Sequence, residues 1–141
     1  MKKSTINLTT ILAFLAVLGV VILAGCSSPK LSSDFNEADV KQAAENVVNL
    51  LNAQDSAGLK QLFTTEMTAA ITDDVFTQIY ADLAEGGSFE AIENISVIGS
   101  TDKSSAEDFA VAIVQAKYEK KTFIYTISFN KQMQLAGLYY K

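Results

Sequence analysis

Cys26 is the residue of this chain best equipped for covalent chemistry. It is the single cysteine among 141 residues, and a thiol is the strongest nucleophile that a protein offers for alkylation. Two small residues, Ala24 and Gly25, precede it, so a cleaving enzyme with a narrow active site could reach the peptide bond before Cys26. Histidine is absent, so the commonest general base and the commonest metal ligand are both missing; arginine is absent as well. We therefore expect chemistry on Cys26 itself, and no metal or other cofactor.

The segment in front of Cys26 has the layout of a secretory signal. Lys2 and Lys3 give it a positive start, an apolar run covers residues 11–24, and small residues close it. The run is too short to span a bilayer comfortably. The alternative is that Cys26 is an ordinary small residue at the end of a transmembrane helix. A lone cysteine in an exported chain favours a special role over that alternative.

The tetrapeptide Leu23-Ala24-Gly25-Cys26 closely resembles the lipobox of bacterial lipoproteins. The resemblance implies that signal peptidase II recognises the first three residues and cuts before Cys26, which carries a diacylglycerol. Two acyl chains hold a protein on a membrane stably, whereas one does so only marginally. We therefore expect a signal peptide over residues 1–25 and a lipid-anchored protein on the extracytoplasmic face of the cell membrane.

The charge of the mature chain excludes some partners. Removal of residues 1–25 deletes two of the eleven lysines and no acid, which leaves 9 lysines against 16 acids and a formal charge of −7. Nucleic acids and anionic lipid surfaces both favour basic patches, so neither is expected to bind the domain directly. Residues 26–33, the lipidated cysteine and a short polar stretch with the only proline, are predicted to form a flexible tether.

The first part of the remaining chain, residues 34–141, has helical periodicity. Residues 34–52 place their apolar side chains on one broad stripe, and Ser33 or Asp34 is expected to cap that helix. A second short helix is predicted to begin at Asp55. A third is predicted after Thr72, because two acids follow this capping residue, and to end at the glycine pair 86–87.

The second part alternates as strands do. Runs over residues 89–98, 108–118, 122–129 and 133–140 are separated by polar turns, and the third of them alternates cleanly between apolar and hydroxyl side chains. Gly137 is expected to mark a bulge or a close-packing point. Helices followed by an antiparallel meander indicate an α+β fold, with N-terminal helices packed on a curved sheet of about four strands.

The domain resembles a known superfamily through its packing and turn patterns. The segments VVNLLNAQDSAGLKQLF (47–63), FEAIENISV (89–97) and KTFIYTISFNKQMQLAGLYY (121–140) are similar to the cone-shaped nuclear-transport-factor-two-like superfamily. Within it, the likeness is to an uncharacterised family of secreted bacterial domains. Such motifs are specific for a fold and poorly specific for an activity.

The resemblance implies a pocket between the long helix and the sheet, where some relatives are isomerases or dehydratases. Glu93 beside Tyr80, Tyr118 and Tyr125, or Glu90 in its place, would be the candidates for a general base and its partners. In the alternative interpretation the two glutamates are solvated and the tyrosines are core rings. Asp73 and Asp74 are explained by a helix N-terminus without a metal.

Two functions of different class remain. The first is a non-catalytic binding or assembly module, with an envelope protein, a small molecule or a second copy of the chain as partner. The resemblance favours pairing through the exposed sheet face, here the threonine-rich residues 122–128 with Tyr139. The second is a small isomerase-like or hydrolase-like enzyme that uses Glu93 and a tyrosine. The position of Glu93, inside a cavity or in solvent, distinguishes the two.

Overall fold

The computed structural model describes residues 29–141, so Leu23, Ala24, Gly25, Cys26 and the expected signal peptide lie outside the described residues. Eight elements follow one another in the described part: α2 (Glu37–Asn52), α3 (Ser56–Leu62), α4 (Thr65–Ala70), α5 (Asp73–Glu85), β1 (Phe89–Thr101), β2 (Asp108–Tyr118), β3 (Thr122–Phe129) and β4 (Leu135–Tyr140). No helix among residues 29–141 is both long and apolar enough to cross a membrane.

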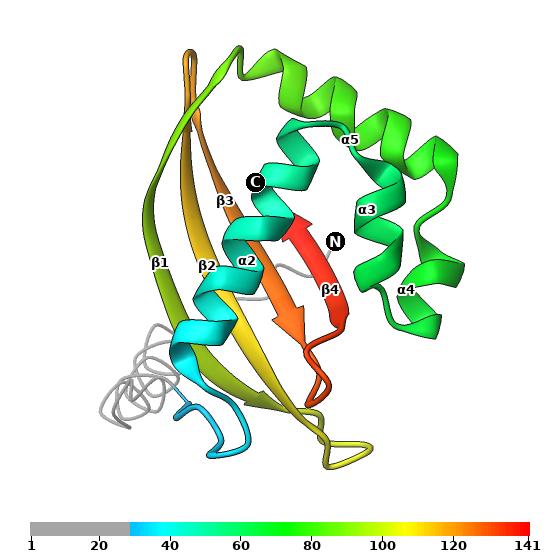
Figure 1. Cartoon of the computed structure of the whole chain (residues 1–141), viewed down its shortest axis with the longest axis vertical. Helices are drawn as coiled ribbons and strands as arrows, with labels where there is room; N and C mark the ends of the chain where they lie inside the picture. The colour runs from blue at the N-terminus through cyan, green and yellow to red at the C-terminus, as the bar shows by residue number, and fades with distance from the viewer. Residues whose placement is uncertain (1–28) are drawn as a thin grey trace, which may run out of the picture.

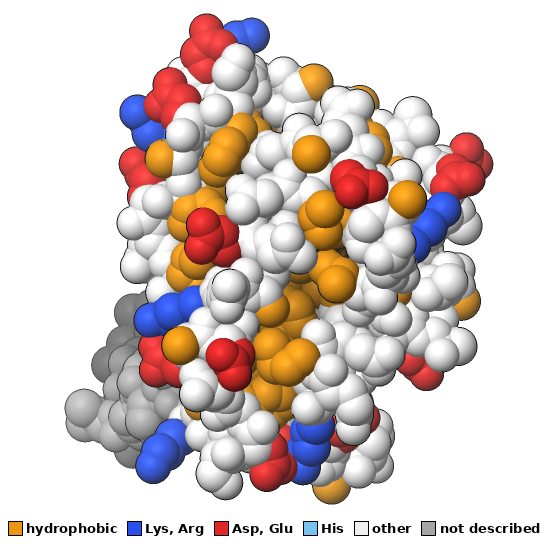
Figure 2. All heavy atoms as spheres, in the orientation of Figure 1, with side chains coloured by type: hydrophobic (Ala, Val, Ile, Leu, Met, Phe, Trp, Pro, Cys, Tyr) orange, Lys and Arg blue, Asp and Glu red, His pale blue; other side chains and the backbone are white. Residues whose placement is uncertain are grey.

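The architecture is the expected α+β arrangement. The four strands form an antiparallel meander in the order β1-β2-β3-β4, and the sheet curves around α2 (Figure 1). Helices α3 and α4 lie on the β4 side, and α5 runs from α4 across one end of the molecule to the start of β1 (Figure 1). On this helical face, hydrophobic side chains gather between α2 and the other helices, and charged side chains lie mostly around them (Figure 2). The prediction of helices on one face of a curved four-stranded sheet is confirmed.

Helix α2 forms where the apolar stripe and a capping residue coincide. The stripe is buried against the sheet, and its members are Val40, Ala44, Val47, Val48 and Leu51. The side chain of Asn36 accepts hydrogen bonds from the backbone N–H groups of Ala38 and Asp39, at 2.9 and 3.3 Å. Asn36 is therefore the N-cap, and the expectation that Ser33 or Asp34 would cap the helix is wrong. Both earlier residues precede Phe35, which turns into the core.

The three shorter helices position the far side of the core. Asp55 caps α3 by accepting from the N–H of Gly58 at 2.8 Å, as expected from the sequence. Helix α4 was not expected; it begins at Thr64, whose hydroxyl accepts from the N–H of Met67. The N–H of Thr64 donates to the carbonyl of Leu135 at 3.0 Å, so α4 is tied to the edge of β4. Thr72 precedes α5 without a side-chain capping bond.

Helices cover one face of the sheet and leave the other face without a helix in the described part of the chain. The inner face packs on the helices and contains the buried Val114, Tyr125 and Ile127. The outer face has no helix over it within the described residues, and Ile113, Thr126 and Tyr139 lie next to one another there through the pairings of β2, β3 and β4. Tyr139 is 61% exposed, the most exposed large hydrophobic side chain in the described part of the chain.

Sequence periodicity missed irregular positions in the strands. Register shifts occur in β1 between Phe89 and Ala91 and between Ile92 and Asn94. The irregularity expected at Gly137 lies beside it, because Gly137 pairs with Ser128 and Leu135 with Phe129, which leaves Ala136 unpaired. Strand β4 begins at Leu135 instead of residue 133, since residues 130–134 form a hydrogen-bonded loop around the Asn130 side chain.

The expected tether is bound to the domain over its second half. Residues 29–33, here named the N-terminal strap, cross β1 at Gly99, whose N–H donates to the carbonyl of Pro29 at 2.9 Å. Leu31 packs against the core, half-buried. Residues 29–33 of the expected tether therefore contact the domain, because Gly99 has no side chain to keep the strap away and Leu31 supplies an apolar contact.

Candidate functional site

A cavity of about 180 Å³ lies where the C-terminal ends of α2 and α5 meet the start of β1 and the end of β2. Its walls are both apolar and polar, and none of these described lining residues is charged. They are Leu51, Leu83, Ala84, Gly87 and Phe89 on the apolar side and Asn52, Gln54, Tyr80, Ser88 and Tyr118 on the polar side. At a liquid share of about 30 Å³ per water, the cavity has room for about six water molecules.

A glycine turn fixes the rim of the cavity. Helix α5 ends at the pair Gly86 and Gly87, and Gly87 has a φ of 77°, a backbone conformation that glycine adopts without strain. The carbonyl of Gly86 accepts from the N–H of Lys120 at 2.8 Å, and that of Ser88 accepts from the N–H of Glu119 at 2.9 Å. The turn after α5 is thereby joined to the turn between β2 and β3, which keeps the rim at a fixed width.

A directed chain of hydrogen bonds forms one wall. The Nδ2 of Asn52 donates to the carbonyl of Val48 at 2.9 Å, so its Oδ1 faces the cavity side and accepts from the hydroxyl of Tyr118 at 2.6 Å. The oxygen of Tyr118 lies 2.6 Å from the hydroxyl of Tyr125. Since Tyr118 donates its proton to Asn52, Tyr125 must donate to Tyr118. The hydrogen bonds therefore all point the same way, from Tyr125 in the sheet through Tyr118 to Asn52 in α2.

Burial keeps these tyrosines neutral. Tyr118 is 3% exposed and Tyr125 fully buried, and this burial raises the pKa of both hydroxyls above the ordinary value. Neutral phenols act as hydrogen-bond donors and acceptors, and they are poor bases. The pair therefore stabilises the wall and orients polar groups, and it does not supply a group that takes protons near neutral pH.

Tyr80 is the polar group of the cavity that lacks a partner. Its ring stacks on Phe76 with centroids 5.8 Å apart, and its hydroxyl is buried. The Ser56 side chain lies close enough to influence this hydroxyl, but no group in the described chain meets it with hydrogen-bond geometry. Burial also raises the pKa of Tyr80, so the hydroxyl keeps its proton. A buried hydroxyl without a partner costs about 1–3 kcal/mol. A ligand that offers a hydrogen-bond acceptor in the cavity would remove this cost.

Glu93 lies outside this cavity, contrary to the expectation. It is exposed, and its Oε2 accepts from Nε2 of Gln115 at 2.7 Å on the outer face of the sheet. Glu90 is also exposed and pairs with Lys117 at 2.7 Å. Each glutamate sits at a register shift of β1, where an extra residue is left out of the strand pairing. Alternation alone does not reveal such an insertion, and neither glutamate can act on a ligand beside Tyr80.

Of the predicted site residues, the structure brings together Tyr80, Tyr118 and Tyr125. Tyr80 and Tyr118 line the cavity, and Tyr125 supports Tyr118 from behind. Sequence reasoning missed Asn52 and Gln54. The sequence contained one signal for them, because both amides follow directly after the apolar stripe of the first long helix. The end of a helix that covers a sheet lies at the edge of the core, where polar side chains can line a cavity.

Three comparisons place the domain among known proteins. The family described as "Protein of unknown function (DUF3887)" matches residues 44–138. No curated protein matches. The chain is similar to the NMR structure of a protein from Ruminococcus gnavus ATCC 29149, with 18% identity, a TM-score of 0.69, and coverage of 79% of this chain and 96% of that one. At this identity the likeness concerns the fold alone.

Proposed function

Because the chain belongs to the DUF3887 family, whose function is unknown and whose match covers residues 44–138, we propose a function from the cavity and the N-terminal sequence. The protein is a lipoprotein held by diacylglycerol on Cys26 at the extracytoplasmic face of the cell membrane. Its domain is a non-catalytic binding module of the cone-shaped, nuclear-transport-factor-two-like kind. Its ligand is small, uncharged, and offers a hydrogen-bond acceptor.

The observation that carries the binding role is the unpaired hydroxyl of Tyr80 in an uncharged cavity. A charged ligand would be buried there without a counter-charge, which is costly. A neutral ligand with apolar and acceptor groups matches walls such as Leu83 and Phe89 and the free donor of Tyr80. The volume of about 180 Å³ lies below the range of about 300–1,000 Å³ for drug-sized ligands, so the ligand is correspondingly small.

A catalytic role has weaker support. General acid–base catalysis needs a group with a pKa near the working pH, within hydrogen-bond reach of the substrate. The cavity offers phenols whose pKa burial raises, and the acids Glu90 and Glu93 occupy the other face of the sheet. An isomerase-like or hydrolase-like mechanism based on Glu93 therefore has no base at the site.

Native mass spectrometry of residues 27–141, purified gently from cells, tests the binding role. We expect a reproducible small adduct on the parent protein and its loss in Tyr80→Phe, which removes only the unpaired hydroxyl. Thr77→Val, on the exposed side of the same helix, is the matched control and should keep the adduct. A parent protein that carries no adduct from cell extract, or an adduct unaffected by Tyr80→Phe, contradicts this site.

The lipid anchor needs its own test. Cells that express the full chain and receive a clickable fatty acid should label it, and Cys26→Ala should abolish the label and release the protein from membranes. Cys26→Ser keeps the size of the side chain and should behave like the alanine variant, because a hydroxyl is not alkylated by the pathway. Labelling that persists in either variant would refute lipidation at Cys26.

Self-assembly is a second candidate, favoured by the exposure of Tyr139. This side chain pairs across the strands with Thr126 and lies near Ile113 on the outer face, which no described helix covers. Aromatic residues are enriched in protein interfaces relative to the rest of the surface. Sedimentation should show a dimer that Thr126→Lys splits and that Thr77→Lys, exposed on α5 on the other face, leaves intact. A profile unchanged by Thr126→Lys contradicts this surface.

A further inference from the structure

The N-terminal strap fixes the point at which the chain leaves the domain. Besides the bond from Gly99 to Pro29, a Cβ atom on Gly99 would lie 2.2 Å from the carbonyl oxygen of Lys30 and 3.1 Å from the Cα of Leu31. The strap backbone thus lies directly on the backbone of β1. A contact this close is possible only because position 99 is glycine.

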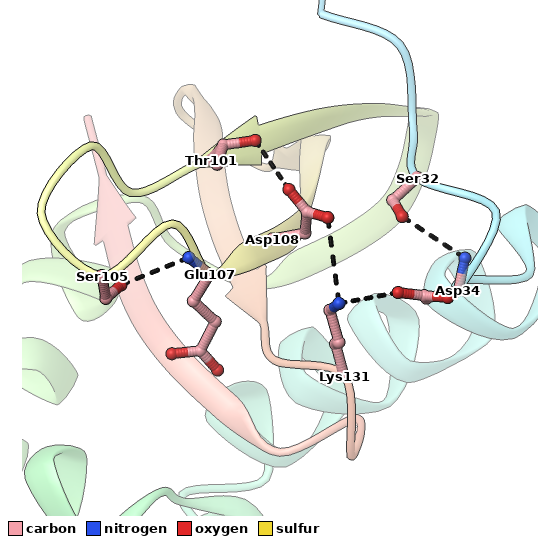
Figure 3. A network of polar contacts seen from close by, with 7 residues as sticks. All are labelled: Ser32, Asp34, Thr101, Ser105, Glu107, Asp108 and Lys131. Carbon is pink, nitrogen blue, oxygen red and sulfur yellow. Dashed lines mark hydrogen bonds and ion pairs between the residues drawn. The ribbon is translucent and has the colours of Figure 1, made fainter.

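Polar contacts hold the strap at its other end as well. The N–H of Phe35 donates to the carbonyl of Ser32 at 3.1 Å. The carboxylate of Asp34 lies 2.7 Å from Nζ of Lys131, which also faces Asp108 at 3.9 Å (Figure 3). The strap is therefore tied to β1 through Pro29, and the residue that follows it, Asp34, is tied to Lys131 in the loop between β3 and β4. We name this region, with the loop 102–107, the anchor end.

The segment between the strap and the lipid is short. Only three peptide units separate Cys26 from Pro29, and an extended chain spans at most about 3.6 Å per residue, or about 11 Å in total. If Cys26 is lipidated, which is the proposed function on which this inference rests, Pro29 and the strap crossing at Gly99 stay within about 11 Å of the lipidated residue, and the anchor end stays near it.

The cavity lies at the opposite end of the sheet. Its rim contains Phe89, the first residue of β1, whereas the strap crosses the same strand at Gly99. Ten residues of strand, eight of them paired with β2, rise about 3.3 Å each and separate the two positions by about 25–30 Å. Figure 1 shows the same separation: β1 runs from the end of α5 at one extreme of the molecule to the strap and the loop 102–107 at the other.

We propose that the domain stands on the membrane with the anchor end against the lipid headgroups and the cavity facing away from them. The ligand then reaches the cavity from the aqueous phase outside the membrane, and a lipid cannot enter it from the bilayer to which the protein is anchored. Charge does not set this orientation. The anchor end carries Lys30, Lys103 and Lys131 against Asp34, Asp102, Glu107 and Asp108, which is close to neutral. The short connection to the lipid sets it.

Energy transfer to the membrane surface tests the orientation. Cys26 of residues 26–141 is coupled to a maleimide lipid in phosphatidylcholine vesicles whose headgroups carry an acceptor dye. An azide-bearing amino acid replaces either Lys103, at the anchor end, or Lys120, at the rim of the cavity, and receives the donor dye. We expect transfer from position 103 to exceed transfer from position 120 by about twofold or more, given the separation of about 25–30 Å between the ends.

Two changes distinguish the strap from other causes of orientation. An insertion of eight Gly/Ser residues between Ser28 and Pro29 lengthens the connection without touching the fold, and the difference between the two positions should largely vanish. Gly99→Ala should act in the same direction by displacing the strap, whereas Gly137→Ala, whose Cβ would meet only Ser128 atoms at 3.4 Å, should leave the difference intact.

The outcomes separate this inference from the proposed function. Equal transfer from positions 103 and 120, or a difference that survives the eight-residue insertion, overturns the orientation. Because coupling to the lipid is chemical, either result stands whether or not cells lipidate Cys26. Absence of fatty-acid labelling in cells overturns the anchor and leaves the measured geometry of the coupled domain unaffected.

Discussion

The contact between Gly99 and the N-terminal strap gives a sharp stability prediction. In Gly99→Ala, the new Cβ would lie 2.2 Å from the Lys30 carbonyl oxygen, so the strap must move away. The loss includes the hydrogen bond from Gly99 to Pro29, worth about 1 kcal/mol. It also includes the half-burial of Leu31, worth about 1–1.5 kcal/mol. Alanine is better than glycine in a strand by about 0.5 kcal/mol. The net expectation is a loss of about 1.5–2 kcal/mol in the free energy of unfolding.

Urea unfolding followed by far-ultraviolet circular dichroism measures this loss, since the chain has no tryptophan for fluorescence. The decisive comparison repeats the substitution in a domain that begins at Asp34 and lacks the strap. There Gly99→Ala should be neutral or slightly stabilising, because nothing remains for the Cβ to meet. The coupling between the strap and position 99 is then about 2–2.5 kcal/mol by the terms above.

Gly137→Ala is the control in both backgrounds. Position 137 lies in β4, and its new Cβ would make near-ordinary contacts with Ser128 at 3.4 Å. Its effect should be within about 0.5 kcal/mol and the same with and without the strap. A cost of Gly99→Ala that is equally large in the shortened domain would refute the reasoning, because the strain would then lie inside the sheet.

Further expectations concern the tyrosine wall and the glutamates. Tyr118→Phe should destabilise by about 2 kcal/mol, because it leaves the Tyr125 hydroxyl and the Oδ1 of Asn52 without partners. Tyr125→Phe leaves Tyr118 still donating and should cost about 1 kcal/mol; urea unfolding compares the two. Burial raises the pKa of Tyr125, so above about pH 10 the unfolded chain loses this proton before the folded chain does; stability is retained below that pH and should fall above it by up to about 1.4 kcal/mol per pH unit. Absorbance at the tyrosinate band should rise together with the loss of circular dichroism, and ionisation of all tyrosines in a still-folded protein would contradict this. Glu93→Gln should leave the adduct of the native protein unchanged, and its loss would return Glu93 to the site.

The regular elements could be predicted because their burial follows a simple period. The stripe of α2 and the alternation of β3, where Phe123, Tyr125, Ile127 and Phe129 are buried, follow directly from helical and strand geometry. Helix α4 could not be predicted in this way, since six residues with Met67 as the sole buried side chain carry no period. Its position depends on the tertiary bond from Thr64 to Leu135, which no local pattern contains.

The candidate site was predictable in its aromatic part and not in its acidic part. Alternation predicts Tyr118 and Tyr125 on the inner faces of β2 and β3, and the structure places their hydroxyls 2.6 Å apart there. Glu93 was placed on the wrong side because two register shifts in β1 change which residues face the helices. The Tyr80 hydroxyl lacks a partner because of how α5 packs against the surrounding elements, and tertiary packing of this kind cannot be predicted from a local sequence pattern.

The edge of β1 bears on the choice between binding and assembly. A long edge strand invites another chain to pair with it, and bulges, charges or a covering segment prevent this. In β1 the first half contains two register shifts at the charged Glu90 and Glu93, and in the second half the strap occupies Gly99. Strand addition at this edge is therefore hindered along most of its length. Pairing through the β1 edge is therefore disfavoured, which leaves the outer face around Tyr139 as the assembly surface that Thr126→Lys tests directly.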